Sequence, residues 1–146
     1  MEINLDGSFD LKSGLEDSFS FLTNLQELSA CVPDLKEVKL LDKHNLEAVL
    51  VIKIGPINGN FNATCDLESS RPDAINLKID GSGGASALHL TILIKLEKKA
   101  EKITTVGWNA KATISGLVSG LGETILRKVS DSKIQDIINN LNARSG

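Results

Sequence analysis

The chain has 146 residues, 41% of them hydrophobic, and a formal net charge of -3. This balance predicts one domain, residues 1–146, that buries its own core, and it excludes a disordered chain or one dominated by membrane spans. The acidic balance also excludes a nucleic-acid-binding surface, because binding phosphate requires clustered Lys and Arg side chains. The cluster at Lys98, Lys99 and Lys102 is interrupted by Glu101 and predicts a solvated hairpin tip.

The N-terminal segment alternates apolar and polar residues from Ile3 to Leu11, which predicts a strand with one solvated face. The chain enters this strand directly, without a basic segment followed by an apolar stretch. No secretory signal is therefore expected, and the sequence predicts a cytoplasmic protein. The two cysteines, Cys31 and Cys65, are expected to be reduced in that compartment.

Two short helices are expected next, and both end before Pro33. Ser13 precedes Glu16 by three residues and Asn24 precedes Glu27 by three, so each pair offers a capping side chain followed by a carboxylate. Leu and Phe residues recur at helical spacing after each cap.

From Leu35 to Thr113 the period-two pattern returns and predicts an antiparallel meander of about six strands joined by short hairpins. Turn signals interrupt the pattern at residues 42–45, 55–59, 69–73, 81–84 and 98–101. In the segment KIGPINGNF, we expect Gly55 and Pro56 to set a bend and Gly59 to remove an inward-facing side chain.

The segment DGSGGASA, residues 80–87, admits two interpretations. A dinucleotide-binding fingerprint would need a third glycine where Ser86 stands, and it would open a helix, whereas a strand is expected to follow. A wide bend or bulge in the sheet is therefore the favoured interpretation.

A long amphipathic helix is expected to close the chain, from about Leu117 to Ala143. Its apolar stripe consists of Leu117, Leu121, Ile125, Val129, Ile134, Ile137, Ile138 and Leu141. Only the apolar face of the sheet is large enough to cover this stripe. The sequence therefore predicts an α+β fold in which a curved antiparallel sheet packs on one long helix.

Small residues are concentrated where the first turns of this helix would meet the sheet. They are Gly59, Ala63, Ala110, Ala112, Gly116, Gly120 and Gly122. They either leave an apolar cavity or only let the helix approach the sheet closely, and the cavity is favoured because ligand pockets are usually apolar concavities. Trp108 shares its strand face with Ala110, and it either lines this hollow or packs in the core.

Residues suited to catalysis or metal binding are scarce. Gly116, Ser119 and Gly120 lack the G-x-S-x-G spacing of a hydrolase nucleophile. The two histidines, His44 and His89, are too few for a zinc site, and His89 is expected to be exposed or at a rim. We therefore predict no catalytic residue, no metal and no enzyme.

Five segments carry a resemblance to a known family, in this order and spacing. They are MEINLDGSFDL at residues 1–11, SACVPDL at 29–35, KIGPINGNF at 53–61, DGSGGASA at 80–87 and NAKATISGLVSGLGETILRKVSD at 109–131. On these segments the chain resembles the CoxG family, named after the G component of carbon monoxide dehydrogenase, in the START-like, or SRPBCC, superfamily. The sequence departs from the family at Asp34, where Gly is common, and at residues 85–87, where a further glycine is frequent.

This resemblance implies a helix-grip (START/Bet v 1-like) fold, with a seven-stranded antiparallel sheet curled around the C-terminal helix and a hydrophobic tunnel between them. It also implies a non-catalytic accessory role beside a molybdenum-containing carbon monoxide dehydrogenase or related hydroxylase, in membrane recruitment and, in some members, quinone binding. Many members carry a C-terminal membrane-binding extension, and we expect none here because the sequence stops a few residues after its helix. We therefore expect only transient docking at the inner face of the membrane, through a lip formed by Val32, Pro33 and Leu35.

Two functions follow from these expectations. The first is a cytoplasmic protein that shelters a lipophilic ligand, such as a quinone or lipid, and needs no other cofactor. Its cavity lining is predicted to consist of Phe61, Ala63, Leu77, Leu90, Trp108, Ala110, Leu121 and Ile125. The second is a structural or assembly factor whose core is filled and whose surface recognises a partner enzyme.

Overall fold

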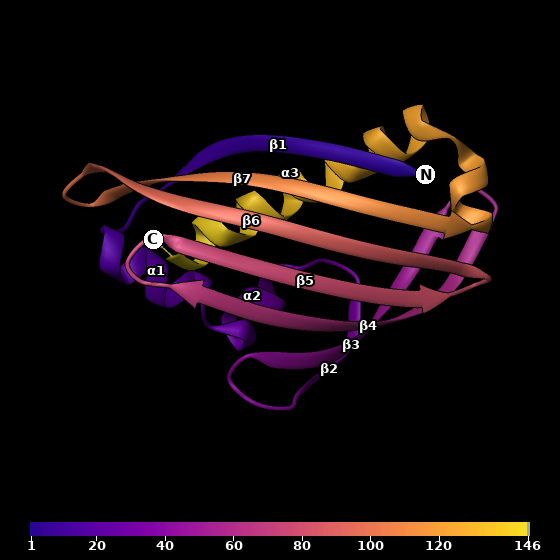
Figure 1. Ribbon diagram of the computed structural model, residues 1–146, viewed down its shortest axis with the longest axis horizontal. Coiled ribbons are helices and arrows are strands. Elements are labelled where there is room, and N and C mark those ends of the chain that lie inside the picture. Colours follow the sequence, from indigo (N-terminus) through magenta and orange to yellow (C-terminus); the bar gives the residue numbers. More distant parts are fainter. Residues whose placement is uncertain (146) are drawn as a thin grey trace.

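The computed structural model describes residues 1–145 (Figure 1). Its strands are β1 (Glu2–Leu11), β2 (Leu35–Leu40), β3 (Asn45–Ile54), β4 (Ile57–Ser70), β5 (Ala74–Gly83), β6 (Ser86–Ala100) and β7 (Ile103–Gly116). Its helices are α1 (Leu15–Leu22), α2 (Leu25–Cys31), the 3₁₀-helix η1 (Leu117–Leu121) and α3 (Glu123–Ser145). One strand, two short helices, six strands and a long helix therefore follow in the order that the sequence predicts.

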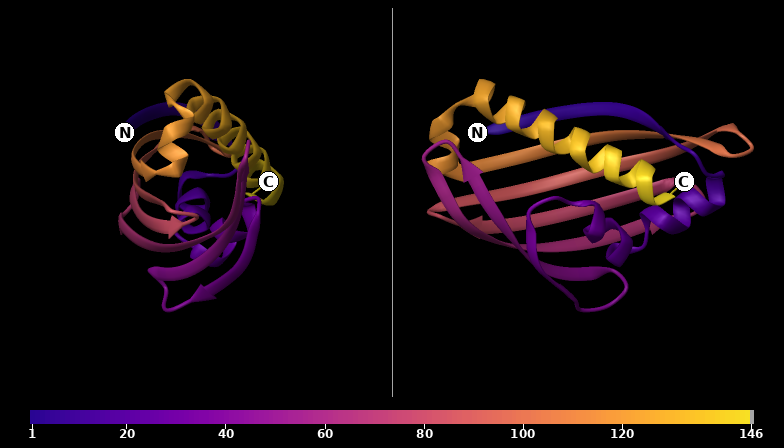
Figure 2. Two further views of the ribbon diagram at one scale, coloured as in Figure 1. Left: turned by 90° about the vertical axis from the view of Figure 1, so that its right-hand side faces the viewer. Right: turned by 180° about the vertical axis from the view of Figure 1, so that it is seen from behind.

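The strands form one seven-stranded antiparallel sheet in the order β1-β7-β6-β5-β4-β3-β2. The sheet curls, and α3 runs diagonally across its concave side (Figure 2). Because side chains alternate along each strand, the sheet has an inner face toward α3 and an outer face. Leu5, Ala110, Ile92 and Leu77 stand opposite one another on the inner face of four successive strands. The expected α+β helix-grip arrangement is confirmed.

The hairpin between β3 and β4 confirms the bend expected in KIGPINGNF. Gly55 has a φ of 57° and occupies the first of two loop positions, with Pro56 at the second. A type II′ turn has this arrangement, and its first position favours glycine because φ is positive there. Gly59 lies inside β4, where a Cβ added to it would meet no heavy atom within 4 Å.

The segment DGSGGASA does not form the wide bend that we expected. It continues β5 to Gly83 and reverses within two residues, Gly84 and Ala85, before β6 begins. Both turn residues have positive φ, 56° and 59°, as in a type I′ hairpin. The prediction was wrong because the glycines have other roles. Gly83 allows β5 to lie close to β4, since a Cβ there would lie 2.2 Å from the carbonyl oxygen of Asn60, and Gly84 forms the tight turn.

The two short helices match the predicted caps in part. Asn24 caps α2, because its side chain accepts a hydrogen bond from the amide of Glu27 at 3.1 Å. Ser13 does not cap α1. Gly14 occupies the N-cap position without a side-chain bond, and the Ser13 hydroxyl lies 2.5 Å from that of Ser18. The cap predicted for the first helix is wrong because this serine pairs with another hydroxyl.

The long helix begins later than predicted. Residues 117–121 form η1, and Gly122, with a φ of 89°, changes the chain direction before α3. Leu117 and Ile125 are consequently 61% and 47% exposed, so their predicted place in the buried stripe is wrong. The changed phase of the helix turns Leu126 rather than its neighbour Ile125 toward the sheet, and Leu126 and Leu141 are buried.

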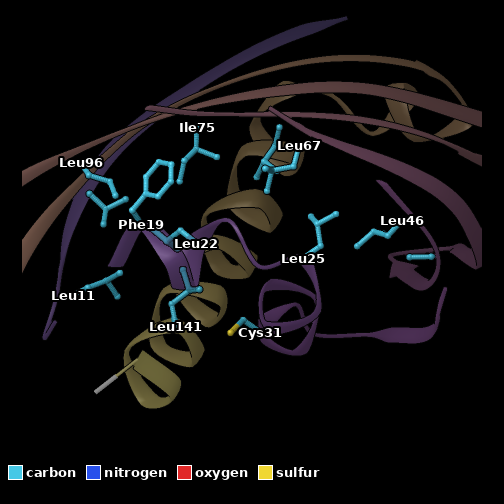
Figure 3. Packing of buried hydrophobic residues seen from close by; sticks show 13 residues of the cluster. Leu11, Phe19, Leu22, Leu25, Cys31, Leu46, Leu67, Ile75, Leu96 and Leu141 are labelled. Carbon is cyan, nitrogen blue, oxygen red and sulfur yellow. The ribbon is translucent and has the colours of Figure 1, made fainter. Parts of the chain in front are cut away.

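The hydrophobic core fills one end of the sheet, beside α1 and α2 (Figure 3). From α1, Phe19 and Leu22 point toward the inner face, where Phe19 lies between Leu96 and Ile75. Leu141, near the end of α3, joins the same cluster. Fully burying a side chain of this size stabilises a fold by about 1.5–3 kcal/mol. This end of the molecule therefore supplies most of the packing energy.

Candidate ligand-binding site

The two ends of the sheet differ in how their inner faces are covered. At the closed end, where α1 and α2 pack, Val106, Leu96 and Ile75 are at most 2% exposed. At the open end, where η1 and the β3–β4 hairpin lie (Figure 2), apolar inner-face residues remain partly exposed. They are Ala63, Ile79, Leu88, Leu90, Ala110, Ala112 and Ile114. Because these side chains point toward α3, the space between sheet and helix is incompletely packed there.

Glycines distinguish the filled parts of the inner wall from the open parts. A Cβ on Gly81 would lie 2.5 Å from the ring of Phe61, and one on Gly7 would lie 2.8 Å from the indole of Trp108. Aromatic rings therefore occupy the room that these two glycines leave. By contrast, a Cβ on Gly59 would meet nothing within 4 Å, so this position faces open space.

The glycines around η1 divide in the same way. Gly120 and Gly122 face open space, since a Cβ on either would have no heavy atom within 4 Å. Gly116 has a φ of 87°, and a Cβ there would lie only 2.0 Å from the carbonyl oxygen of Ala85. Of the two interpretations of the small residues, close approach therefore describes Gly116, whereas Gly120 is exposed at the surface and Gly122 is partly exposed, so these two do not decide between them.

Six of the predicted lining residues lie on the inner face of β4 to β7, namely Phe61, Ala63, Leu77, Leu90, Trp108 and Ala110. Phe61 and Leu77 are 7% and 8% exposed, and the other four are partly exposed. Trp108 stands nearer to the closed end, opposite Ile94. The remaining two, Leu121 and Ile125, lie on η1 and α3 rather than on the sheet.

The helix α3 is fastened to its surroundings differently on its two sides. On the β1 side, the guanidinium of Arg127 donates a hydrogen bond to the carbonyl of Asn4 at 3.2 Å. On the β3 side, Lys133 forms an ion pair with Asp34 in the link between α2 and β2. Within residues 1–145, no hydrogen bond or ion pair joins α3 or η1 directly to β3 or β4. We refer to this side of α3, which has no direct polar contact with β3 or β4 within the described residues, as the opening.

The pairing of Asp34 with Lys133 is a feature that the sequence did not reveal. The two residues are separated by 99 positions, and neither belongs to a recognisable motif. The available signal was the departure from glycine at position 34, which marks a turn that needs a positive φ. That signal locates the turn but says nothing about which helix residue its carboxylate meets.

The inner face of the open end carries little that can perform acid–base chemistry. Within the described chain, the inner-face strand residues of β4 to β7 there are apolar or small, and the nearest titratable one along β4 is Cys65, which packs against the core cluster. Burial raises the pKa of the Cys65 thiol to about 11, with a smaller contribution from the charge of Asp66, so the thiol is protonated at neutral pH. Residues 1–145 contain no group of three or more His, Cys, Asp and Glu side chains placed to hold a metal ion. The arrangement therefore offers apolar contacts rather than acid–base or metal-ligating groups among the described residues.

Two open grooves cross the outer face of the sheet. The first spans β1, β7, β6, β5 and β4 and contains the exposed Leu93, and Trp108 borders it. The second spans β2 to β7, and Ala63 borders it. In the second groove, His89 Nδ1 lies 2.5 Å from Asp80 Oδ1, and the two side chains are 55% and 64% exposed. His89 is thus exposed, as predicted, whereas the grooves follow from the curvature of the sheet and have no local sequence signal.

Exposed apolar side chains lie beside the opening. Leu117 in η1 and Ile125 in α3 are the most exposed of them, and Ile54 and Ile57 flank the turn of the β3–β4 hairpin. Among residues 1–145, no helix is both long enough and apolar enough to cross a membrane.

The fold and the apolar inner face define the class of the protein, which is START-like. The structure of a START superfamily protein from Mycobacterium smegmatis is similar, with a TM-score of 0.76 and 9% identity over 97% of this chain and 96% of that chain. The Zhui aromatase/cyclase from Streptomyces sp. R1128 has a TM-score of 0.72 and 10% identity over 99% of this chain and 94% of that chain. At these identities the likeness shows the fold alone.

The comparison of the sequence with models of known protein families identifies the family. The family model CoxG, which describes the G component of carbon monoxide dehydrogenase, matches residues 7–146, and the chain belongs to this family. The resemblance carried by the five segments is confirmed. A conserved protein from Geobacillus kaustophilus has a similar crystal structure, with a TM-score of 0.89 and 24% identity over 98% of this chain and 95% of that chain. Among curated proteins, no sequence matches this chain.

Proposed function

We propose that this protein is a non-catalytic accessory protein that binds an apolar small molecule, a lipid or a quinone, at the open end of its sheet. One observation carries the proposal. Apolar side chains such as Leu88, Leu90 and Ile114 face the helix from the middle of the sheet and are nevertheless partly exposed. Leaving such side chains in contact with water is unfavourable, and an apolar guest would remove them from it.

The energy available to the site favours a ligand with a long tail. Each buried CH₂ group contributes about 0.8 kcal/mol, whereas association costs at least about 4 kcal/mol. Roughly fifteen buried carbons are therefore needed for micromolar affinity. An acyl chain or an isoprenoid tail meets this requirement, and a small aromatic ring does not. We place Ala63, Leu90 and Ala110 in the lining, together with the other predicted lining residues.

The absence of a catalytic role is part of the proposal. The strand residues that face the helix at the open end include no Asp, Glu or His, and general acid–base catalysis requires such a group within hydrogen-bond reach of the substrate. The fold is shared with an aromatase/cyclase at 10% identity, which carries no argument about activity.

The partner and the location are proposed from the family. Membership of the CoxG family of carbon monoxide dehydrogenase supports an accessory role beside a molybdenum-containing dehydrogenase or hydroxylase. We place the protein in the cytoplasm, with transient docking at the inner face of the membrane. Docking would use the partly exposed lip of Val32, Pro33 and Leu35, together with the more exposed Leu117 and Ile125.

The test replaces Ala110, on the inner face, with Trp and replaces Asn109, the next residue on the outer face, in the same way. Native mass spectrometry of the purified protein is expected to show a bound lipid or quinone in the wild type and in the Asn109→Trp control. The Ala110→Trp variant is expected to fold and to carry no such molecule, because the indole occupies the space. Equal retention by both variants would contradict the proposal.

The second candidate, an assembly factor with a filled interior, is favoured by one observation, the two grooves across the outer face. It predicts that no molecule is recovered from the wild type by organic extraction. It also predicts that Ala110→Trp loses stability and partner binding together, since the indole would then enter a packed core.

A further inference from the structure

Asp34 has a backbone conformation that is unusual for its residue type. Its φ is 66°, in the left-handed region that glycine adopts freely and other residues adopt at a cost. A glycine would hold the same turn without strain. Outliers of this kind persist where surrounding contacts stabilise them, and they are concentrated at functional positions.

Two contacts hold Asp34, one through its backbone and one through its side chain. The carbonyl oxygen accepts a hydrogen bond from the amide of Val51 in β3 at 2.9 Å. The carboxylate accepts a hydrogen bond from Nζ of Lys133 in α3, as part of an ion pair. Asp34 therefore connects the sheet to the helix across the side on which the opening lies. A glycine would keep the first contact and lose the second.

The connection stands level with the open end of the sheet. Val51 pairs with Asn60 in β4, the neighbour of the predicted lining residue Phe61. The other polar contacts of α3 on this side lie further toward its C-terminus. They are the hydrogen bond from Asn140 to the carbonyl of Cys31 and the ion pair of Arg144 with Glu27. The pair of Asp34 and Lys133 is thus the contact nearest to the opening among these three.

The ion pair is weak enough to open and close readily. The side chains of Lys133 and Asp34 are 50% and 46% exposed. Ion pairs with this exposure contribute little to stability and are screened by salt. A contact of this strength can affect the rates at which a molecule enters and leaves the site, but it adds little to the stability of the fold.

We propose that Asp34 and Lys133 form a clasp that controls how fast an apolar molecule enters and leaves the open end. When the ion pair forms, the segment of residues 32–35 joins β3 to α3 and narrows the opening. When it breaks, α3 is released on that side and the opening widens. The clasp rests on the proposed function, since it regulates the same site. The ion pair contacts none of the predicted lining residues, so it does not change the affinity for the bound molecule. The rates of binding and release therefore change by the same factor.

The test measures exchange of N-phenyl-1-naphthylamine, a neutral fluorophore whose emission increases in apolar surroundings, by stopped-flow fluorescence. The Lys133→Met variant keeps the length of the side chain and removes its charge. Its association and dissociation rates are expected to rise together, by up to about five-fold, with the affinity unchanged. Lys128→Met is the matched control, because Lys128 is exposed on the same helix and forms no ion pair in residues 1–145. It is expected to keep the wild-type rates.

Two further measurements identify the clasp itself. In an Asp34→Gly background, Lys133→Met is expected to change the rates no further, because the partner carboxylate is already gone. Raising the ionic strength to about 1 M, where the Debye length is about 3 Å, is expected to bring the wild-type rates close to those of Lys133→Met.

Amide hydrogen exchange provides a readout that needs no ligand. The Val51 amide is expected to exchange faster in Lys133→Met than in wild type or Lys128→Met, because the segment that carries its acceptor is released. Probe binding with identical rates in all variants, or unchanged exchange at Val51, would overturn the clasp and leave the proposed function standing. Failure of the wild type to take up the probe, with faster exchange at Val51 in Lys133→Met, would overturn the proposed function and the role of the clasp in it.

Discussion

The closed and open ends of the sheet are built from the same strands, yet only one of them is packed. At the closed end, α1 lies over the inner face, and Phe19 and Leu22 are each 2% exposed. At the open end, only η1 and the first turns of α3 face the strands within the described residues, and Leu90 and Ala110 remain partly exposed. The difference shows that the closed end contributes most of the buried apolar packing and that the inner face of the open end is less completely covered.

The difference arises from where the connections fall. The link between β1 and β2 contains both short helices and supplies side chains to the closed end. The links at the open end are two-residue hairpins at residues 55–56 and 84–85, which are too short to cover anything. Only η1 and the first turns of α3 remain to face the strands there. The incomplete packing is therefore a consequence of chain topology.

The largest expected effect on stability is at Gly116, and Gly59 at the same end is the comparison. Gly116→Ala is expected to destabilise the protein by about 2–6 kcal/mol, because φ is positive and the new Cβ would meet the Ala85 carbonyl. Gly59→Ala is expected to change stability by less than about 1 kcal/mol, since its Cβ enters open space. Urea denaturation of both variants measures the difference. Similar losses in both would mean that the region around Gly59 is packed.

A pair of leucines compares the two ends directly. Leu22→Ala removes a side chain that is 2% exposed and is expected to cost about 2–5 kcal/mol, including the cavity left behind. Leu90→Ala, at a partly exposed position, is expected to cost about 1 kcal/mol, because it enlarges a space that is already open. Thermal and urea unfolding test this order. A cost for Leu90→Ala equal to that of Leu22→Ala would remove the distinction between the ends.

The smallest effect concerns the helix that helps to close the packed end. Asn24→Ala is expected to cost about 1 kcal/mol, because the amide of Glu27 loses its acceptor. Asn24→Ser keeps an acceptor and serves as the control. Circular dichroism during urea unfolding compares the two, and a loss of the same size in Asn24→Ser would show that the side-chain cap contributes nothing.

Local patterns in the sequence predicted most of the fold. The alternation from Ile3 to Leu11, the Gly55-Pro56 bend and the Asn24 cap depend on residues within a few positions of one another, and all three are present in the structure. The interruption at Gly122 was missed because the apolar spacing continues through it. Gly120 and Gly122 were the local signal of an interruption, but the apolar spacing that continues past them favoured an unbroken helix.

The candidate site was predictable only as far as the alternation of side chains allows. Period two placed Ala63, Leu90 and Ala110 on the inner face, but the burial of each depends on which helix covers it. That depends on packing between segments far apart in the chain. The pairing of Asp34 with Lys133 and the grooves on the outer face arise from the same long-range geometry and have no short-range signal.

The two cysteines permit the most direct test, because they differ in how fully the inner face is covered around them. Cys31 is fully buried at the closed end, whereas Cys65 is partly exposed on the inner face of β4, where it packs against the core cluster. Burial raises the pKa of both thiols, that of Cys65 to about 11, so the labelling rate of Cys65 should rise about tenfold per pH unit between pH 7 and 9.

The decisive measurement is the rate at which N-ethylmaleimide labels each cysteine in the native protein, followed by peptide mass spectrometry. If the inner face is incompletely covered beside the core cluster, Cys65 reacts without unfolding while Cys31 reacts only through global unfolding, and both react alike in denaturant. Native labelling of Cys65 that is as slow as that of Cys31 and limited by unfolding would contradict the account.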